Sequence, residues 1–263
     1  MAPSGNTIVL VRNHSEEAAI LILICVAFLV ACSPTSTAQR SSSPAVATAT
    51  SPTAAAPSST ASFPAVRYVA IGASDAVGVG ATDPAKGSWP SLIAARLPAG
   101  SGYVNLGVSG SIALQAGREQ LPGAIAQRPT VVTIWLAVND LNATIERASY
   151  AEALGGIIDA LVQRTDATIF VGNVPDLRAV PVYAGVDKLA LLARITAYND
   201  AIAQIAARSP TRVSVVDLFT GSADLVSTAT VASDGFHPSD AGYQLIADRF
   251  AIAMRAKGVP LRT

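Results

Sequence analysis

The sequence predicts an α/β fold, a three-layer α/β/α sandwich around a mainly parallel five-stranded sheet. Between residues 66 and 263, short apolar runs alternate with longer amphipathic stretches, the pattern of strands connected by helices. The run VVTIWLA at Val131–Ala137 is apolar at nearly every position, as expected for a strand buried on both faces. A region of roughly 200 residues suits a single domain.

Each element of this domain follows from the same apolar pattern. The expected strands are Val66–Ile71, Tyr103–Leu106, Val131–Ala137, Ala167–Val171 and Val213–Leu218. The expected helices are Trp89–Leu97, Tyr150–Arg164, Lys188–Arg208 and Ser239–Lys257. Ser239 is suited to cap the last helix, because a serine hydroxyl can accept a hydrogen bond from a first-turn N–H group.

Charge and cysteine content exclude several classes of function. The chain has 18 basic and 18 acidic residues and no basic run, so we expect no nucleic-acid partner. The two cysteines, Cys25 and Cys32, both precede the predicted domain, which therefore has no disulfide and no cysteine-based metal site. We expect the domain to be a monomer.

The apolar run Ala18–Ala31 predicts a signal peptide over residues 1–31. At about 14 residues it is shorter than the roughly 20 needed for a transmembrane helix. It ends in Leu29-Val30-Ala31-Cys32, which resembles a bacterial lipobox. The resemblance implies cleavage before Cys32 and lipidation of its thiol, and thus a protein anchored at the extracytoplasmic face of a bacterial membrane.

Two alternatives remain at this end of the chain. Glu16 and Glu17 stand where a signal peptide usually has net positive charge, so the run could instead be a plain membrane anchor. If the lipobox interpretation is wrong, the protein could also be secreted. Residues 32–65 are almost entirely Ser, Thr, Ala and Pro, which predicts a disordered tether ahead of a domain at 66–263.

Two polar residues before the last helix are candidates for acid–base chemistry. His237 is one of two histidines in the chain, and the other, His14, lies in the predicted signal peptide. Asp234 precedes His237 by three residues, which is close enough to orient an imidazole. The pair could equally belong to an ordinary polar loop, so its interpretation depends on a nucleophile elsewhere.

Three further candidates follow the first three predicted strands. Ser74 comes after the first strand, Gly107 after the second and Asn139 after the third. Because carboxyl ends of parallel strands share one edge of a sheet, these residues can meet. A serine, a histidine with its carboxylate, and N–H donors are what ester hydrolysis requires. The chain has no G-x-S-x-G elbow and no Walker A loop, and Gly78-Val79-Gly80 lacks the third glycine of a dinucleotide loop.

The ordered set of motifs resembles the SGNH hydrolase superfamily, also called GDSL esterases and lipases. The blocks are GASDAVGVGATDP, NLGVSG, AVND and SDGFHPS, and the similarity extends from Arg67 to about Val259. It implies a flavodoxin-like SGNH hydrolase fold. Ala73 stands where the family usually has Asp, and Ala137 where it usually has Gly.

The resemblance implies a serine esterase that forms an acyl-enzyme. Ser74, His237 and Asp234 match the catalytic triad, and the backbone N–H groups of Ser74 and Gly107 with the Asn139 side chain match the oxyanion hole. No metal or cofactor is implied. The resemblance implies that the substrate is a lipid, short-acyl or O-acetylated glycan ester. An acyltransferase using the same triad, or a non-catalytic surface lipoprotein, are the alternatives.

Overall fold

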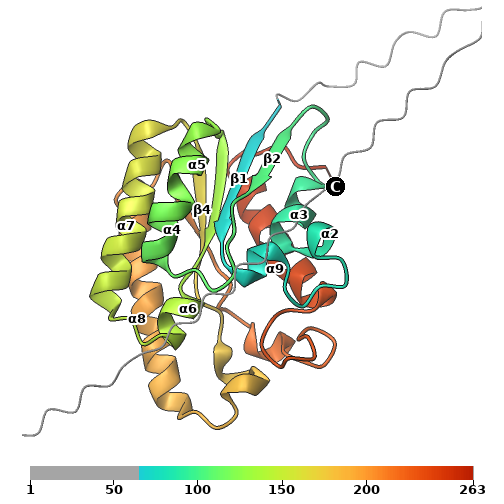
Figure 1. Cartoon of the computed structure of the whole chain (residues 1–263), viewed down its shortest axis with the longest axis vertical. Coiled ribbons are helices and arrows are strands. Elements are labelled where there is room, and N and C mark those ends of the chain that lie inside the picture. The colour runs from blue at the N-terminus through green and yellow to red at the C-terminus, as the bar shows by residue number, and fades with distance from the viewer. Residues whose placement is uncertain (1–64, 263) are drawn as a thin grey trace, which may run out of the picture. The chain divides into compact units, whose positions relative to one another are not determined.

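The computed structural model of the protein describes residues 65–262, which form a sheet of five parallel strands flanked by helices (Figure 1). The strands are β1 (Arg67–Gly72), β2 (Gly102–Asn105), β3 (Val131–Trp135), β4 (Thr168–Gly172) and β5 (Val213–Val216). Their order, β2-β1-β3-β4-β5, is the flavodoxin-like doubly wound order. The predicted signal peptide (1–31), lipidated Cys32 and nearly all of the tether (32–65) lie outside the described residues.

Helices cover both faces of the sheet, which confirms the predicted three-layer sandwich (Figure 1). The helices on one face are α4 (Ala113–Glu119), α5 (Leu121–Ala126), α7 (Arg147–Arg164) and α8 (Lys188–Ala206). Those on the other face are α3 (Trp89–Ala94) and α9 (Asp240–Ala256). Shorter segments are α1 (Ser74–Val77), α2 (Pro84–Gly87), α6 (Val138–Asn142), and the 3₁₀ turns η1 (Leu177–Ala179), η2 (Pro181–Tyr183) and η3 (Ala223–Leu225).

Successive side chains along the strands point to opposite faces of the sheet, and an apolar core lies on each face. In β3 every residue is buried, with Val132 and Ile134 facing one core and Val131 and Trp135 the other. This is the continuous apolar strand that the sequence predicts. On the second face, Trp89 of α3 stacks on a phenylalanine of α9, with 4.6 Å between ring centroids.

Most predicted elements are present, and the differences have physical reasons. The third strand ends at Trp135 rather than Ala137, because Ala137 takes a φ of 99° and turns the chain into α6. Helices α4 and α5 were not predicted, since only alanines are buried on them and alanine contributes little to a hydrophobic pattern. The predicted N-cap is confirmed: the Ser239 hydroxyl accepts a hydrogen bond from the Gly242 N–H.

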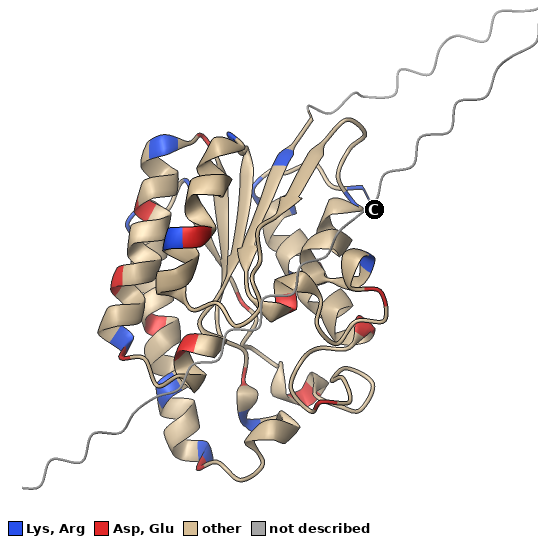
Figure 2. Ribbon diagram, viewed as in Figure 1, with Lys and Arg blue, Asp and Glu red and all other residues tan. Residues whose placement is uncertain are grey.

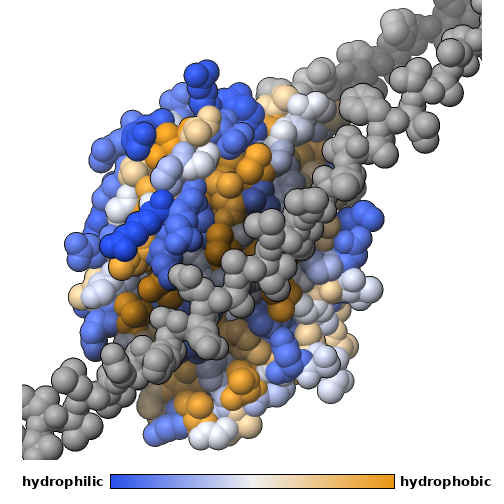
Figure 3. All heavy atoms as spheres, viewed as in Figure 1, coloured by the Kyte–Doolittle hydropathy of each residue, from blue (hydrophilic) through white to orange (hydrophobic). Residues whose placement is uncertain are grey.

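Charges of both signs lie on the face of the domain seen in Figure 2. Both α7 and α8 carry acidic as well as basic residues. On the same face, hydrophobic residues form small patches separated by hydrophilic ones (Figure 3). Within residues 65–262, no helix is both long and apolar enough to cross a membrane.

Candidate active site

Ser74 lies at the carboxyl edge of the sheet, in the sharp turn from β1 into α1. Two glycines make this turn possible. A Cβ on Gly72 or on Gly107 would lie 2.7 Å from the Ala76 Cβ, so only glycine allows the backbones to approach α1 this closely. Ser74 is the first residue of the helix, where a backbone N–H has no intrahelical acceptor. This strand order reverses direction between β1 and β3, where doubly wound sheets bind ligands.

His237 contacts Ser74 although the two residues are 163 positions apart in the sequence. The distance from His237 Nε2 to Ser74 Oγ is 2.9 Å, and that from His237 Nδ1 to Asp234 Oδ2 is 2.5 Å. A carboxylate can only accept, so Nδ1 carries the proton and Nε2 is free to accept from the serine hydroxyl. The structure thus brings Ser74, His237 and Asp234 into one hydrogen-bonded chain.

The loop around Asp234 holds its carboxylate in the ionised form. Asp234 Oδ1 accepts hydrogen bonds from the N–H groups of Phe236 at 2.9 Å and His237 at 3.0 Å. Gly235 takes a φ of 71°, a conformation that suits glycine, and so lets the loop fold back on itself. Burial alone would raise the pKa of Asp234, but hydrogen bonds from the His237 side chain and from the backbone outweigh it and lower the pKa.

The expected oxyanion donors differ in their availability. Asn139 Nδ2 donates one hydrogen bond to the Ser111 carbonyl at 3.1 Å, and an amide nitrogen has a second N–H to offer. The Gly107 N–H instead donates to Asn105 Oδ1 at 3.0 Å, while Asn105 Nδ2 donates to the Ala76 carbonyl at 2.7 Å. An oxyanion would have to share the Gly107 N–H with Asn105 or displace it, so that role stays a prediction.

Sequence reasoning missed Gln120, which holds the end of β1. This side chain is 1% exposed. Its Oε1 accepts from the Gly72 N–H at 3.0 Å, and its Nε2 donates to the Gly72 carbonyl at 3.0 Å and to Ser111 Oγ at 3.1 Å. Because Ser111 in turn binds Asn139, one buried amide connects the nucleophile turn to the Asn139 side chain. In the sequence, a buried glutamine looks the same as an exposed one.

Two further acidic groups lie near this arrangement. Asp140, which is buried, accepts from the Ala113 N–H with both carboxylate oxygens at 3.1 Å and so joins α6 to α4. Asp75 Oδ1 accepts from the N–H groups of Ala73 at 3.2 Å and Ala76 at 2.5 Å. Burial raises the pKa of Asp75 to about 6, against opposing hydrogen bonds. Among the described residues, no cluster of three His, Cys, Asp or Glu side chains suits a metal ion.

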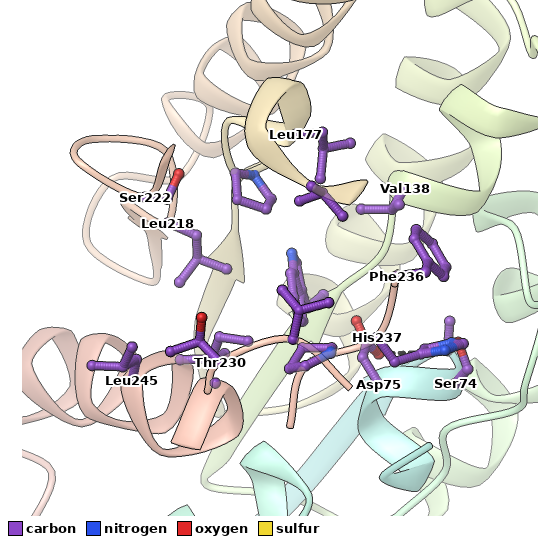
Figure 4. Close-up of a pocket in the computed structure, with 18 of the residues that line it drawn as sticks. Ser74, Asp75, Val138, Leu177, Leu218, Ser222, Thr230, Phe236, His237 and Leu245 are labelled. Carbon is purple, nitrogen blue, oxygen red and sulfur yellow. Dashed lines mark hydrogen bonds between the residues drawn. The ribbon is translucent and has the colours of Figure 1, made fainter. Parts of the chain in front are cut away.

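A cavity of about 150 Å³ opens beside Ser74 and His237. Its lining comes from the loops after all five strands, of which the loop after β5 carries His237, and from α9. Figure 4 shows Ser74, Asp75 and His237 at one end and Leu218, Thr230 and Leu245 at the other. The cavity therefore lies directly next to the serine hydroxyl.

Comparisons with known proteins identify one family by sequence and several structures of the same fold. The sequence profile of the GDSL-like Lipase/Acylhydrolase family matches residues 70–245. No curated protein matches the chain. Among solved structures, TesA is 20% identical with a TM-score of 0.58, and the match covers 73% of this chain and 99% of TesA.

Two other solved structures have the same fold. LAE5, an α/β hydrolase enzyme from the metagenome of Lake Arreo, is 22% identical with a TM-score of 0.59, covering 75% of this chain and 97% of LAE5. A family 3 carbohydrate esterase from Clostridium thermocellum is 20% identical with a TM-score of 0.56, covering 73% of this chain and 98% of that one. At these identities the similarities establish the fold.

Proposed function

Because the chain belongs to the GDSL-like lipase/acylhydrolase family and is an ester-hydrolysing enzyme, we propose that Ser74, His237 and Asp234 form its catalytic triad. One observation carries the proposal: the two consecutive hydrogen bonds, of 2.9 Å and 2.5 Å, that join the three side chains. The second is short because the Asp234 carboxylate is charged, and charge shortens and strengthens a hydrogen bond.

The first half of the reaction transfers the acyl group to the enzyme. Ser74 Oγ attacks the ester carbonyl carbon while His237 Nε2 takes the hydroxyl proton. The tetrahedral intermediate places its negative oxygen near the Ser74 N–H and the free N–H of Asn139, with Gly107 as the third expected donor. His237 then gives its proton to the leaving oxygen, the C–O bond breaks, and the alcohol departs from an acyl-Ser74 ester.

The second half uses water in place of the alcohol. His237 Nε2 removes a proton from the water as its oxygen attacks the acyl carbon, and then returns that proton to Ser74 Oγ as the acid leaves. Throughout, Asp234 keeps the imidazole oriented and stabilises its charged form. Transfer to a sugar hydroxyl would use the same steps, and analysis of the products distinguishes the two reactions.

The assignment is tested by replacing the nucleophile. Ser74→Ala should abolish hydrolysis of p-nitrophenyl esters, and a fluorophosphonate probe should label the wild type but not this variant. Ser209→Ala is the matched control. Ser209 lies just before β5, at the amino-terminal ends of the strands, whereas Ser74 lies at their carboxyl ends. Retained turnover in Ser74→Ala would refute the nucleophile, and a wild type without turnover or labelling would favour a non-catalytic binding protein.

Membrane attachment is a separate proposal that rests on Leu29-Val30-Ala31-Cys32. Signal peptidase cleavage would leave Cys32 at the N-terminus, where several acyl chains together hold a protein firmly on a membrane. When the protein is expressed in a bacterial host supplied with an alkyne fatty acid, the wild type should be labelled and Cys32→Ala should not. The Cys32→Ala variant should also be lost from the membrane fraction. Labelling that survives in Cys32→Ala would contradict the proposal.

A further inference from the structure

We propose that the cavity beside Ser74 binds the acyl chain of the substrate, and that the substrate is a linear aliphatic ester of about six to eight acyl carbons. The inference rests on the proposed function, since it takes Ser74 as the nucleophile. It adds what the triad does not specify: which ester, and which residues select it.

The walls of the cavity are apolar along its length. The side chains that face it beyond the triad include Trp135, Leu218, Val226, Val231, Leu245 and Ile246. They come from the carboxyl ends of β3 and β5, the loop after β5, and α9. A chain that entered from acyl-Ser74 would therefore meet mostly hydrocarbon, together with the Trp135 side chain.

Two hydroxyl groups in the lining, those of Ser222 and Thr230, already form hydrogen bonds with the protein. The Ser222 hydroxyl donates to the Phe219 carbonyl at 2.8 Å and accepts from the Asp176 N–H at 2.8 Å. The Thr230 hydroxyl donates to the Leu225 carbonyl at 2.6 Å and accepts from the Ser227 N–H at 2.9 Å.

The indole of Trp135 is also committed, because its Nε1 donates to the Asn173 carbonyl at 3.2 Å. A sugar ring bound against these side chains would bury hydroxyl groups without hydrogen-bond partners, which costs free energy. An alkyl chain needs no hydrogen-bond partner. The lining therefore favours an aliphatic acyl group over a glycan.

Arg249 of α9 also lines the cavity. Its guanidinium donates to the carbonyls of Asp217 at 2.9 Å and Thr220 at 2.8 Å, which ties α9 to the loop after β5. With the charged end held this way, only its aliphatic stem can face a ligand. An apolar cavity of roughly 150 Å³ accommodates a six-carbon molecule such as benzene. This volume sets the expected chain length.

Leu245 offers a direct way to change that length. It lies across the cavity from Ser74 and His237 (Figure 4), on the face of α9 that lines the cavity. Leu245→Trp should shorten the site and Leu245→Ala should lengthen it. Ile252 lies on the same helix but is 65% exposed and outside the lining, so Ile252→Trp is the matched control.

The experiment measures kcat/KM for p-nitrophenyl esters from acetate to palmitate, with acetylated xylo-oligosaccharide alongside, on the full chain. In the wild type, kcat/KM should rise about fourfold for each added methylene up to hexanoate or octanoate and fall for palmitate. Leu245→Trp should lower the octanoate-to-acetate ratio by about 15- to 60-fold, the value of two to three methylenes. Leu245→Ala should move the optimum to longer chains, while Ile252→Trp should keep the wild-type profile.

The outcomes separate this inference from the proposed function. Three results would overturn the acyl site while leaving the triad intact. They are a flat chain-length profile, a preference for the acetylated oligosaccharide, and an optimal chain length that is the same in the wild type and in both Leu245 variants. Loss of all ester turnover and of Ser74 labelling in the wild type would instead remove the proposed function, and the acyl site with it.

Discussion

Replacing Gln120 with leucine tests whether this buried amide holds the nucleophile turn in place. Leucine has a similar size and is apolar, so the change removes hydrogen bonds and leaves little empty space. The variant loses the bonds to the Gly72 N–H, the Gly72 carbonyl and Ser111 Oγ. The Gly72 carbonyl keeps the Val108 N–H at 3.2 Å, but the Gly72 N–H is left buried without an acceptor.

The size of the effect follows from those losses. An unsatisfied buried N–H costs about 1–3 kcal/mol, and each of the other lost bonds contributes about 0.5–1.5 kcal/mol. We expect Gln120→Leu to lower the free energy of unfolding by about 2–6 kcal/mol, or Tm by about 4–24 °C. Because Gly72 comes two residues before Ser74, kcat should fall while KM changes little.

Gln120→Glu is the matched variant, since it keeps the shape and changes one nitrogen to oxygen. Its carboxyl must stay protonated to donate to the Gly72 carbonyl, so this variant should lose stability as pH rises from 5 to 8. Urea unfolding at both pH values and steady-state kinetics provide the readouts. If Gln120→Leu unfolds like the wild type, or Gln120→Glu shows no added pH dependence, the role given to Gln120 is wrong.

Two further predictions concern Asn139 and Asp75. Asn139→Ala should lower kcat by about 10²–10³-fold, the value of one oxyanion donor. Asn142→Ala, on the same helix, is the control and should leave kcat unchanged. Equal kcat values for the two variants would show that Asn139 is not an oxyanion donor. In the folded protein, burial raises the pKa of Asp75 from 3.8 to about 6. Its contribution to the free energy of unfolding is therefore fully present below pH 3.8 and is lost as pH rises through about 6. The loss amounts to at most about 3 kcal/mol. Asp75→Asn should therefore lose less stability than the wild type between pH 4 and 7 in urea unfolding, and parallel pH dependences would contradict this.

The residues at strand ends could be predicted because topology determines their position. Once the strands are parallel, the turns that follow β1 and β3 must share one edge, so Ser74 and Asn139 can be placed together before any side chain is known. His237 was identified because the predicted domain contains no other histidine. The fold class was predicted from the alternation of apolar and amphipathic stretches, and the family from the resemblance of four motif blocks.

What the sequence did not reveal depends on contacts between segments far apart in the chain. Gln120 is 48 residues from Gly72, and nothing local distinguishes it from an exposed glutamine. The Gly107 N–H was expected to be free, but the Asn105 side chain two residues earlier accepts from it. The apolar cavity is built by residues from five loops and one helix, so its depth has no signature in any single stretch.

The central claim is that Ser74 carries the acyl group during turnover. Rapid quenching of the wild type with p-nitrophenyl octanoate, followed by mass spectrometry of peptides, measures this directly. The account predicts an octanoyl adduct on the Ser74 peptide that forms during the first turnover and is absent in Ser74→Ala. Steady turnover with no adduct under rapid quenching, or with the adduct on another residue, would contradict it.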